Sequence, residues 1–201
     1  MPRWPWTWPR ANFPIPNPSF PHLNPGQNGN HTRMSWSTSR YNCIAWAADD
    51  PMRPWWPQSY NAYWPPSPVI NANTIPAFMS AFESLGYVDC AGDYSLELGY
   101  EKIAIYAWPN GDPQHAARQL ANGQWTSKLG LRYWPDIRHS LPKDVSGPLY
   151  GQPVCCMKRP RQKLSLHNSF SRLSRLAHIF IWEVSTFARW LTFGGTMYDE
   201  R

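Results

Sequence analysis

The pattern of apolar and polar residues predicts a short helix that begins at Cys43. Residues 41–48 read Tyr-Asn-Cys-Ile-Ala-Trp-Ala-Ala, and the alanines in this run favour a helix. Asn42 is a preferred N-cap residue, which places Cys43 in the first turn. Two aspartates and a proline at 49–51 end the helix. It is about two turns long, so packing against the rest of the domain must stabilise it.

A second helix is predicted at residues 75–85. Thr74 is a suitable N-cap, and Pro76 fits the first turn. Phe78 and Phe82 recur at helical spacing, and a glycine ends the run. We therefore expect both phenylalanines in the hydrophobic core.

Much of the remaining central segment alternates between apolar and polar residues, which is typical of β-strands. A turn cluster at 108–113 and an Ala-Asn-Gly loop at 121–123 separate the clearest strands. Residues 130–148 are expected to form a loop. The expected strands are residues 87–90, 102–107, 115–120, 124–129 and 154–158. A helix followed by an antiparallel meander is an α+β arrangement.

The two ends of the chain differ in composition from its centre. Residues 1–30 hold eight of the 22 prolines, which predicts an extended arm that binds an aromatic-lined groove, lies on its own domain or stays loose. Residues 165–193 carry apolar side chains at helical spacing within a basic tail at 158–201. Such an amphipathic helix binds a membrane surface, docks on a partner or covers its own domain. The central domain is then 31–157.

Charge limits the classes of partner. Residues 1–156 carry 11 Lys and Arg against 10 Asp and Glu, whereas 157–201 carry 8 against 3. The central domain is nearly neutral, which argues against nucleic-acid binding. No apolar signal region and no uncharged apolar stretch of about 18 residues is visible, so we expect a cytoplasmic protein without a membrane span.

The four cysteines form no Cys-x-x-Cys pair, so neither a zinc ribbon nor a thioredoxin-like motif is indicated. Adjacent Cys155 and Cys156 point to opposite faces if they lie in a strand. We interpret them as strand residues and not as a disulfide, which suits a reducing compartment.

Cys43 and His115 are the candidate catalytic pair. Unpaired N–H groups and the helix dipole at a first turn stabilise a thiolate, the reactive form of cysteine. In a hairpin with a three-residue loop, the side chains of His115 and Ser127 share one face with Ala117, Trp125 and Leu129. We expect the helix to cover that face, with Ser127 orienting the imidazole. A two-residue loop would place Lys128 there instead.

These residues resemble a known fold. The order of a cysteine on a short helix, a histidine opening a strand and a polar residue on the next strand resembles the papain-like fold. Within it, the NlpC/P60 and CHAP amidase-type families are closest. Their histidine strand often runs His-apolar-small-apolar-x-x-Gly-Asn-x-x-aromatic-apolar-polar, and His115 to Ser127 follows that outline with Asn122 and Trp125 in register. The segment 41–157 also looks similar to an uncharacterised bacterial domain family with an Asn-Cys-Ile-Ala-Trp-Ala motif.

The resemblance implies a cysteine hydrolase or acyl-transfer enzyme that acts on amide or isopeptide bonds of a peptide or protein and needs no cofactor. Cys43 is then the nucleophile, His115 the base and Ser127 the third residue. Asp136 and His139 are alternative third residues on the next loop. Asn42-Cys43-Ile44-Ala45 replaces the usual Asp-Cys-Ser-Gly of NlpC/P60 proteins, so cell-wall peptides are not implied as the substrate.

Other interpretations stay open. The proline- and aromatic-rich loop 54–66 offers flat apolar surface for a substrate, or covers the core. With an inactive cysteine, the same loop would make the domain a peptide-binding module. Cys43, His115 and His139 are a third option as zinc ligands. The residues of this loop that would form the binding surface are Trp55, Trp56, Tyr63 and Trp64.

Overall fold

The computed structural model describes residues 18–24, 29–35, 37–130 and 136–161. The predictions for the first 17 residues of the arm and for the amphipathic helix at 165–193 lie outside these residues. Within the described ranges, no helix has both the length and the apolar character needed to cross a membrane.

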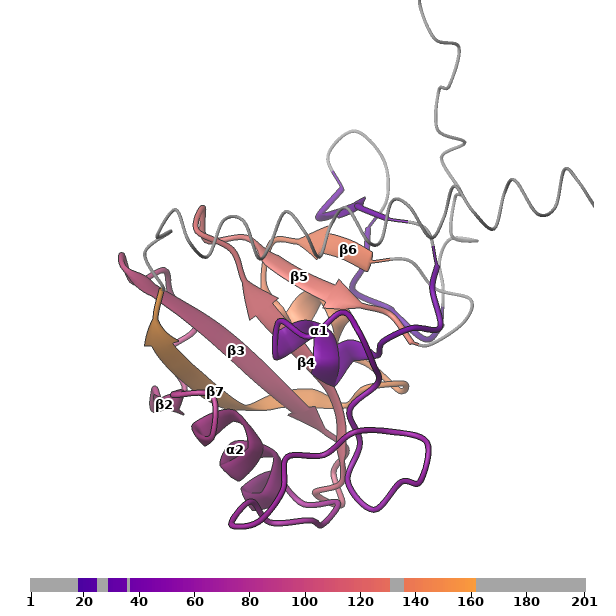
Figure 1. Ribbon diagram of the computed structural model, residues 1–201. Helices are drawn as coiled ribbons and strands as arrows, with labels where there is room; N and C mark the ends of the chain where they lie inside the picture. Colours follow the sequence, from indigo (N-terminus) through magenta and orange to yellow (C-terminus); the bar gives the residue numbers. More distant parts are fainter. Residues whose placement is uncertain (1–17, 25–28, 36, 131–135, 162–201) are drawn as a thin grey trace, which may run out of the picture. The chain divides into compact units, whose positions relative to one another are not determined.

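A seven-stranded antiparallel sheet dominates the fold, with strand order β1-β6-β5-β4-β3-β7-β2 (Figure 1). Strands β3 to β6 follow one another as a meander, and β7 returns to the free side of β3. The broad α+β expectation is confirmed, although the sheet is larger than the sequence predicts. The strands are β1 (His31–Arg33), β2 (Val88–Asp89), β3 (Tyr100–Ala107), β4 (Pro113–Gln119), β5 (Trp125–Lys128), β6 (Asp136–His139) and β7 (Gln152–Pro160).

The hairpin between β4 and β5 has the predicted register. Arg118 lies opposite Thr126, and the Leu120 amide donates to the Gln124 carbonyl over 2.7 Å. The loop is therefore 121–123, and its glycine has a φ of 85°, a conformation that favours glycine.

The two predicted helices are present. Helix α1 spans Cys43–Ala47, and its N-cap Asn42 accepts a hydrogen bond from the Ala45 amide over 3.1 Å. Helix α2 spans Ile75–Glu83 behind the N-cap Thr74. Phe78 and Phe82 on α2 are buried, as expected.

The expectation of a loop at 130–148 was wrong. This segment contains β6 and a 3-10 helix, η1 (Pro142–Val145). Strand β6 pairs with β5 on one side and with β1 on the other. The sequence of β6, Asp-Ile-Arg-His, has little apolar character. Hydrogen bonding to a strand on each side stabilises β6, although its sequence lacks the alternation of apolar and polar residues that predicts a strand.

The interpretation of Cys156 as an unpaired strand residue was also wrong. Strand β2 pairs with β7 so that Asp89 lies opposite Met157. Cys90 then stands beside Cys156, with 5.4 Å between the Cα atoms, and the two form a disulfide. Cys43 and Cys155 are free and buried. A pairing across 66 residues depends on sheet topology, which spacing in the sequence does not reveal.

Alternate residues of β3 and β4 enter two different apolar clusters, because successive side chains in a strand point to opposite faces. Helix α1 packs on the face of Ala116, and Ala117 faces the other way. The expectation that the helix covers the face of His115 and Ala117 is therefore wrong. The helix-side cluster includes Cys43, Ile44, Trp55, Phe78, Phe82, Ile103, Ile105, Ala116, Cys155 and Met157. The far-side cluster is Phe20, Ala104, Tyr106, Ala117, Trp125, Leu129, Ile137, Val145 and Tyr150.

Candidate functional site

Helix α1 is fixed to its surroundings by side chains on both sides of Cys43. The side-chain NH2 group of Asn42 donates to the Trp55 carbonyl over 2.7 Å, and its Oδ1 accepts from the backbone N–H of Trp55 over 3.1 Å. One turn later, the Trp46 indole N–H donates to Thr126 Oγ1 over 3.1 Å. Beyond the helix, Asp49 pairs with Arg118 of β4 over 2.7 Å. These contacts set the position of the sulfur relative to the β4–β5 hairpin.

The Cys43 sulfur lies against the backbone of β4 at the residues that flank His115. Its thiol is 3.9 Å from the Gln114 carbonyl oxygen, and the Ala116 amide is among its hydrogen-bond donors. Burial raises the pKa of the Cys43 thiol to about 11. The amides of Ala116, Ile44 and Cys43 itself, and the charge of Lys128, act in the opposite direction. These groups would stabilise a thiolate once it forms, but the resting thiol is protonated at neutral pH.

His115 is held at one end of a buried hydrogen-bond chain. Its Nε2 lies 3.0 Å from Ser127 Oγ, which lies 2.9 Å from His139 Nε2. At the far end, His139 Nδ1 is 2.8 Å from the Leu141 carbonyl oxygen. A carbonyl only accepts, so His139 Nδ1 carries a proton and the Nε2 of the neutral ring accepts from Ser127. Ser127 then accepts from His115 Nε2–H.

This order of donors leaves the Nδ1 of His115 as an unprotonated nitrogen with a free lone pair. Among the described residues, Nδ1 is buried and has no hydrogen-bond partner. Burial, and then the nearby His139, lower the pKa of His115 well below its usual value. Burial likewise lowers the pKa of His139 to about 4. Both rings are therefore neutral at pH 7, which is the form that accepts a proton.

The structure brings Ser127 and His139 to His115, whereas the Cys43 side chain lies in the helix-side cluster and makes no hydrogen bond to the imidazole among the described residues. The thiol contacts the Gln114 carbonyl, and the imidazole points into the far-side cluster. The strand pairing around His115 is irregular in two ways. The pairing of β4 with β5 covers only residues 118 and 119, and the pairing with β3 shifts register between Tyr106 and Ala107. Both candidate residues therefore lie at the irregular end of β4.

Two tyrosines that the sequence analysis did not single out enclose the imidazole. The Tyr150 ring stacks on His115 with 4.0 Å between centroids, and Tyr106 meets it edge-on at 5.1 Å. The Tyr106 hydroxyl donates to the Pro142 carbonyl over 2.7 Å. The buried Tyr150 hydroxyl has no partner in the described part of the chain. Burial, and then the charge of Cys43, raise the pKa of Tyr150. No local motif marks Tyr150, because its place depends on how β7 begins.

Asp136 takes no part in the hydrogen-bond chain of His115. Its side chain accepts from the Tyr41 hydroxyl over 2.7 Å, and it stands opposite Lys128 in the β5–β6 ladder. Lys128 is buried below the Tyr41 ring, 5.9 Å from its centroid. This polar group lies on the helix side of β5, because Lys128 and Ser127 alternate. Of the two alternative third residues, His139 is the one that reaches the chain.

The aromatic loop 54–66 packs against the core. Trp55 is 4% exposed, and its indole N–H donates to Asp50 over 2.8 Å. The rings of Trp56 and Trp64 both contact Phe78 of α2, and Tyr63 meets Trp55 edge-on. These four side chains therefore cover the helix-side cluster, which was one of the two predicted roles.

No metal-ligand cluster is found within the described ranges, where groups of three or more His, Cys, Asp or Glu are absent. Cys43, His115 and His139 do not gather as a zinc site would require. Metal-assisted chemistry therefore has no ligand set among these three residues.

Comparison with known proteins gives one family match. The model described as "Domain of unknown function (DUF7689)" matches residues 32–158, which include α1 and the whole hydrogen-bond chain of His115. No curated protein and no solved structure matches the chain.

Proposed function

The chain belongs to the family described as Domain of unknown function (DUF7689), and we propose that it is a cysteine-dependent enzyme of papain-like type. It would hydrolyse an amide or isopeptide bond, or transfer the acyl group to another amine. Cys43 is the nucleophile, His115 the base, and Ser127 with His139 orient the base. A peptide or protein is the substrate class.

One observation carries the proposal: the Cys43 sulfur contacts the peptide groups on both sides of a histidine whose Nδ1 is unprotonated and has no hydrogen-bond partner among the described residues. A buried nitrogen without a hydrogen bond costs about 1–3 kcal/mol. Catalytic hydrogen bonds are often long or unmade before substrate binds. An unprotonated nitrogen on the residue whose flanking peptide groups contact the Cys43 sulfur is a reason for the chain to tolerate that cost.

The first step would proceed from a neutral pair. As the Cys43 sulfur attacks the carbonyl carbon, the thiol proton moves to His115 Nδ1, and the carbonyl π electrons move to oxygen. When the C–N bond breaks, the proton on Nδ1 passes to the leaving nitrogen, and a thioester remains on Cys43. Water or a second amine then gives its proton to Nδ1 and attacks the thioester carbonyl; as the C–S bond breaks, the proton on Nδ1 returns to the departing Cys43 sulfur.

The negative charge that develops on the carbonyl oxygen (the oxyanion) needs hydrogen-bond donors that are already in place. The Cys43 amide is one, because it already points at the sulfur. Tyr150 is the second candidate, because its hydroxyl is buried beside His115 without a partner. A donor that bonds only to the developing charge stabilises the transition state more than the ground state.

Acylation by p-nitrophenyl acetate at pH 7, followed by peptide mass spectrometry, tests the proposal. Cys155 is a matched internal control, because burial also raises its pKa to about 11 and it is nearly as buried as Cys43. We expect Cys43 to be acylated at least about tenfold faster than Cys155, in line with general-base catalysis. The advantage should disappear in His115→Gln, and Cys43→Ser should form no adduct at that position. Equal acylation rates at the two cysteines, or an unchanged rate at Cys43 in His115→Gln, would contradict the proposal that the protein is a cysteine-dependent enzyme.

The second candidate is an inactive papain-like module that binds a peptide through the loop 54–66. The protonated state of Cys43 favours it, since the raised pKa keeps the thiol unreactive at rest. The packing of Trp55 in the core disfavours it. The acylation experiment separates the two, because an inactive module has no reason to show a His115-dependent rate.

A further inference from the structure

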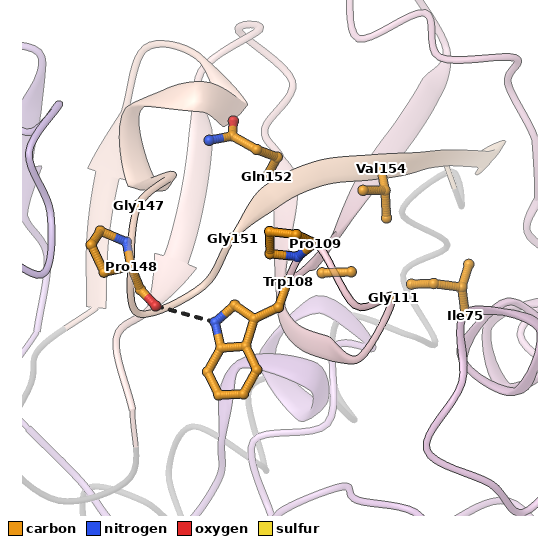
Figure 2. Close-up of a pocket in the computed structure, with 10 residues that line it drawn as sticks. Ile75, Trp108, Pro109, Gly111, Gly147, Pro148, Gly151, Gln152 and Val154 are labelled. Atoms are coloured by element: carbon orange, nitrogen blue, oxygen red, sulfur yellow. Dashed lines mark hydrogen bonds between the residues drawn. The ribbon is translucent and has the colours of Figure 1, made fainter.

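An open pocket lies at the end of the sheet where β3 finishes and β7 begins (Figure 2). Its volume is about 630 Å³, which falls within the range of small-ligand sites and accommodates a few residues of an extended chain. The lining residues are uncharged, and Trp108 and Val154 are 39% and 52% exposed. The Trp108 indole N–H donates to the Pro148 carbonyl over 3.1 Å, which fixes the ring at the pocket (Figure 2).

Residues 19–21, which belong to the N-terminal arm, lie at the rim of this pocket. Phe20 is buried against Tyr150, with 5.4 Å between the ring centroids. On either side of it, the Ser19 carbonyl and the Pro21 ring stand next to Gly147, where a Cβ would come within 3.1 Å and 2.7 Å of them. Gly147 lines the pocket and is joined to Gly151 by two backbone hydrogen bonds. The first described residues of the chain therefore lie beside the pocket wall.

We propose that residues 1–17 bind in this pocket as an intramolecular proline- and tryptophan-rich ligand. The segment contains five prolines and three tryptophans, with two arginines and no acidic residue. Proline-rich chains form polyproline II helices, which dock on exposed aromatic rings with little loss of entropy. Seventeen residues span about 50 Å at about 3.1 Å per residue, so the segment reaches the whole pocket from Pro18.

The last described residues lie farther from the pocket than residues 19–21 do. Arg161 bonds to the carbonyls of Gly99 and Gln119, next to the point where Pro160 pairs with Tyr100. The pocket is at the opposite end of the same ladder, where Ala107 pairs with Gln152. The two ends of β3 are about 23 Å apart at about 3.3 Å per residue. A separate peptide of similar sequence would also compete with a tethered segment whose effective concentration is in the millimolar range.

Limited trypsin digestion of the full chain tests this inference, because Arg10 lies within the proposed ligand. We expect cleavage after Arg10 to be about tenfold faster in Trp108→Ala and in Val154→Lys than in the unmodified chain. Leu98→Ala is the matched control, since Leu98 is an apolar side chain that is 85% exposed outside the pocket. Thermal melting checks that each variant is folded. Equal cleavage rates in all four proteins would overturn the inference.

A photo-crosslinking amino acid at position 154 identifies the occupant. In a mixture of isotopically light and heavy chains, we expect cross-links to residues 1–17 of the same chain. Cross-links to the C-terminal tail, or to residues 1–17 of a second copy, would overturn the proposal. The result does not depend on Cys43 chemistry, so this inference and the proposed enzyme can fail separately.

Discussion

Tyr150 and Tyr106 enclose the same imidazole, yet their hydroxyl groups are in opposite states. The Tyr106 hydroxyl donates to the Pro142 carbonyl, whereas the Tyr150 hydroxyl is buried and has no partner in the part of the chain that the structure describes. Removing an unpartnered buried group costs nothing, but removing one partner of a buried hydrogen bond costs about 1–3 kcal/mol. Tyr106→Phe should therefore lower the free energy of unfolding, and Tyr150→Phe should leave it unchanged or raise it. Urea unfolding of both variants measures the difference.

The same pair tests the proposed oxyanion donor. Loss of one such donor costs about a hundredfold or more in rate. We expect Tyr150→Phe to lower the His115-dependent acylation of Cys43 by about that factor while the protein stays as stable as before. An unchanged acylation rate in Tyr150→Phe would show that the Tyr150 hydroxyl has no part in the reaction.

The chain that joins β4, β5 and β6 through His115, Ser127 and His139 predicts a loss of stability in acid. The pKa of His139 is lowered to about 4 in the folded protein, and an unfolded histidine titrates near 6.5. Above pH 6.5 neither state binds the proton. Between pH 6.5 and 4 only the unfolded state does, so the free energy of unfolding falls by about 1.4 kcal/mol per pH unit, or about 3 kcal/mol in all.

Urea unfolding between pH 7 and 4.5 measures this slope, and His115 adds to it because its pKa is lowered in the same direction. His139→Gln should make the slope shallower, since it removes one of the two groups. An identical slope in that variant would mean that His139 is accessible to protons in the folded state.

The turn between η1 and β7 depends on a glycine at position 151. Its φ is 72°, and a Cβ there would collide with the Ala107 carbonyl. Gly151→Ala combines backbone strain with a steric clash, so we expect it to destabilise the protein by about 2–4 kcal/mol. Gly86→Ala is the matched control, because Gly86 has a φ of 84° but open space around it. It should cost only about 1 kcal/mol. Thermal unfolding compares the two, and equal costs would contradict the predicted clash.

At the level of elements, capping and turn residues correctly predicted the two helices and the β4–β5 hairpin. Asn42 and Thr74 cap helices as their residue types indicate, and the loop 121–123 fixes which residues of β4 and β5 face each other. That register is why the contact between His115 and Ser127 could be anticipated. The position of His139 depends on pairing between β5 and β6, and polar β6 carries no clear strand signal. The face covered by α1 depends on packing, which a five-residue helix does not encode locally.

On the scale of the whole molecule, the sheet is assembled from segments distant in sequence. The edge strand β1 pairs with β6, and β2 at the other edge pairs with β7. The candidate site lies near the middle of the sheet, where β4 carries His115 and receives α1. Residues 19–21 contact the turn that holds Tyr150, so the proposed ligand pocket and the proposed site share one structural support. A change in that turn would therefore affect both.

The disulfide between Cys90 and Cys156 links the β2 edge to β7 and closes a loop of 66 residues. By loop-closure entropy, a cross-link of this size stabilises a protein by about 4 kcal/mol. Replacing both cysteines by alanine should lower the free energy of unfolding by about 2–4 kcal/mol. Cys155→Ala is the control for a cysteine that is buried but free. Equal stability of the double variant and the unmodified chain would show that the link contributes nothing.

The same bond bears on the predicted cytoplasmic location, because disulfides persist mainly in oxidising compartments. Cells that produce the protein can be lysed directly into a denaturing solution of an alkylating reagent, which traps every free thiol. Mass spectrometry should then find two alkylated cysteines, Cys43 and Cys155, if the protein resides where the disulfide is stable. Four alkylated cysteines would indicate a reducing compartment, where β2 is held to β7 by its ladder hydrogen bonds alone. The chain would then lose the stability of the cross-link, and its edge strand would be the first part to open.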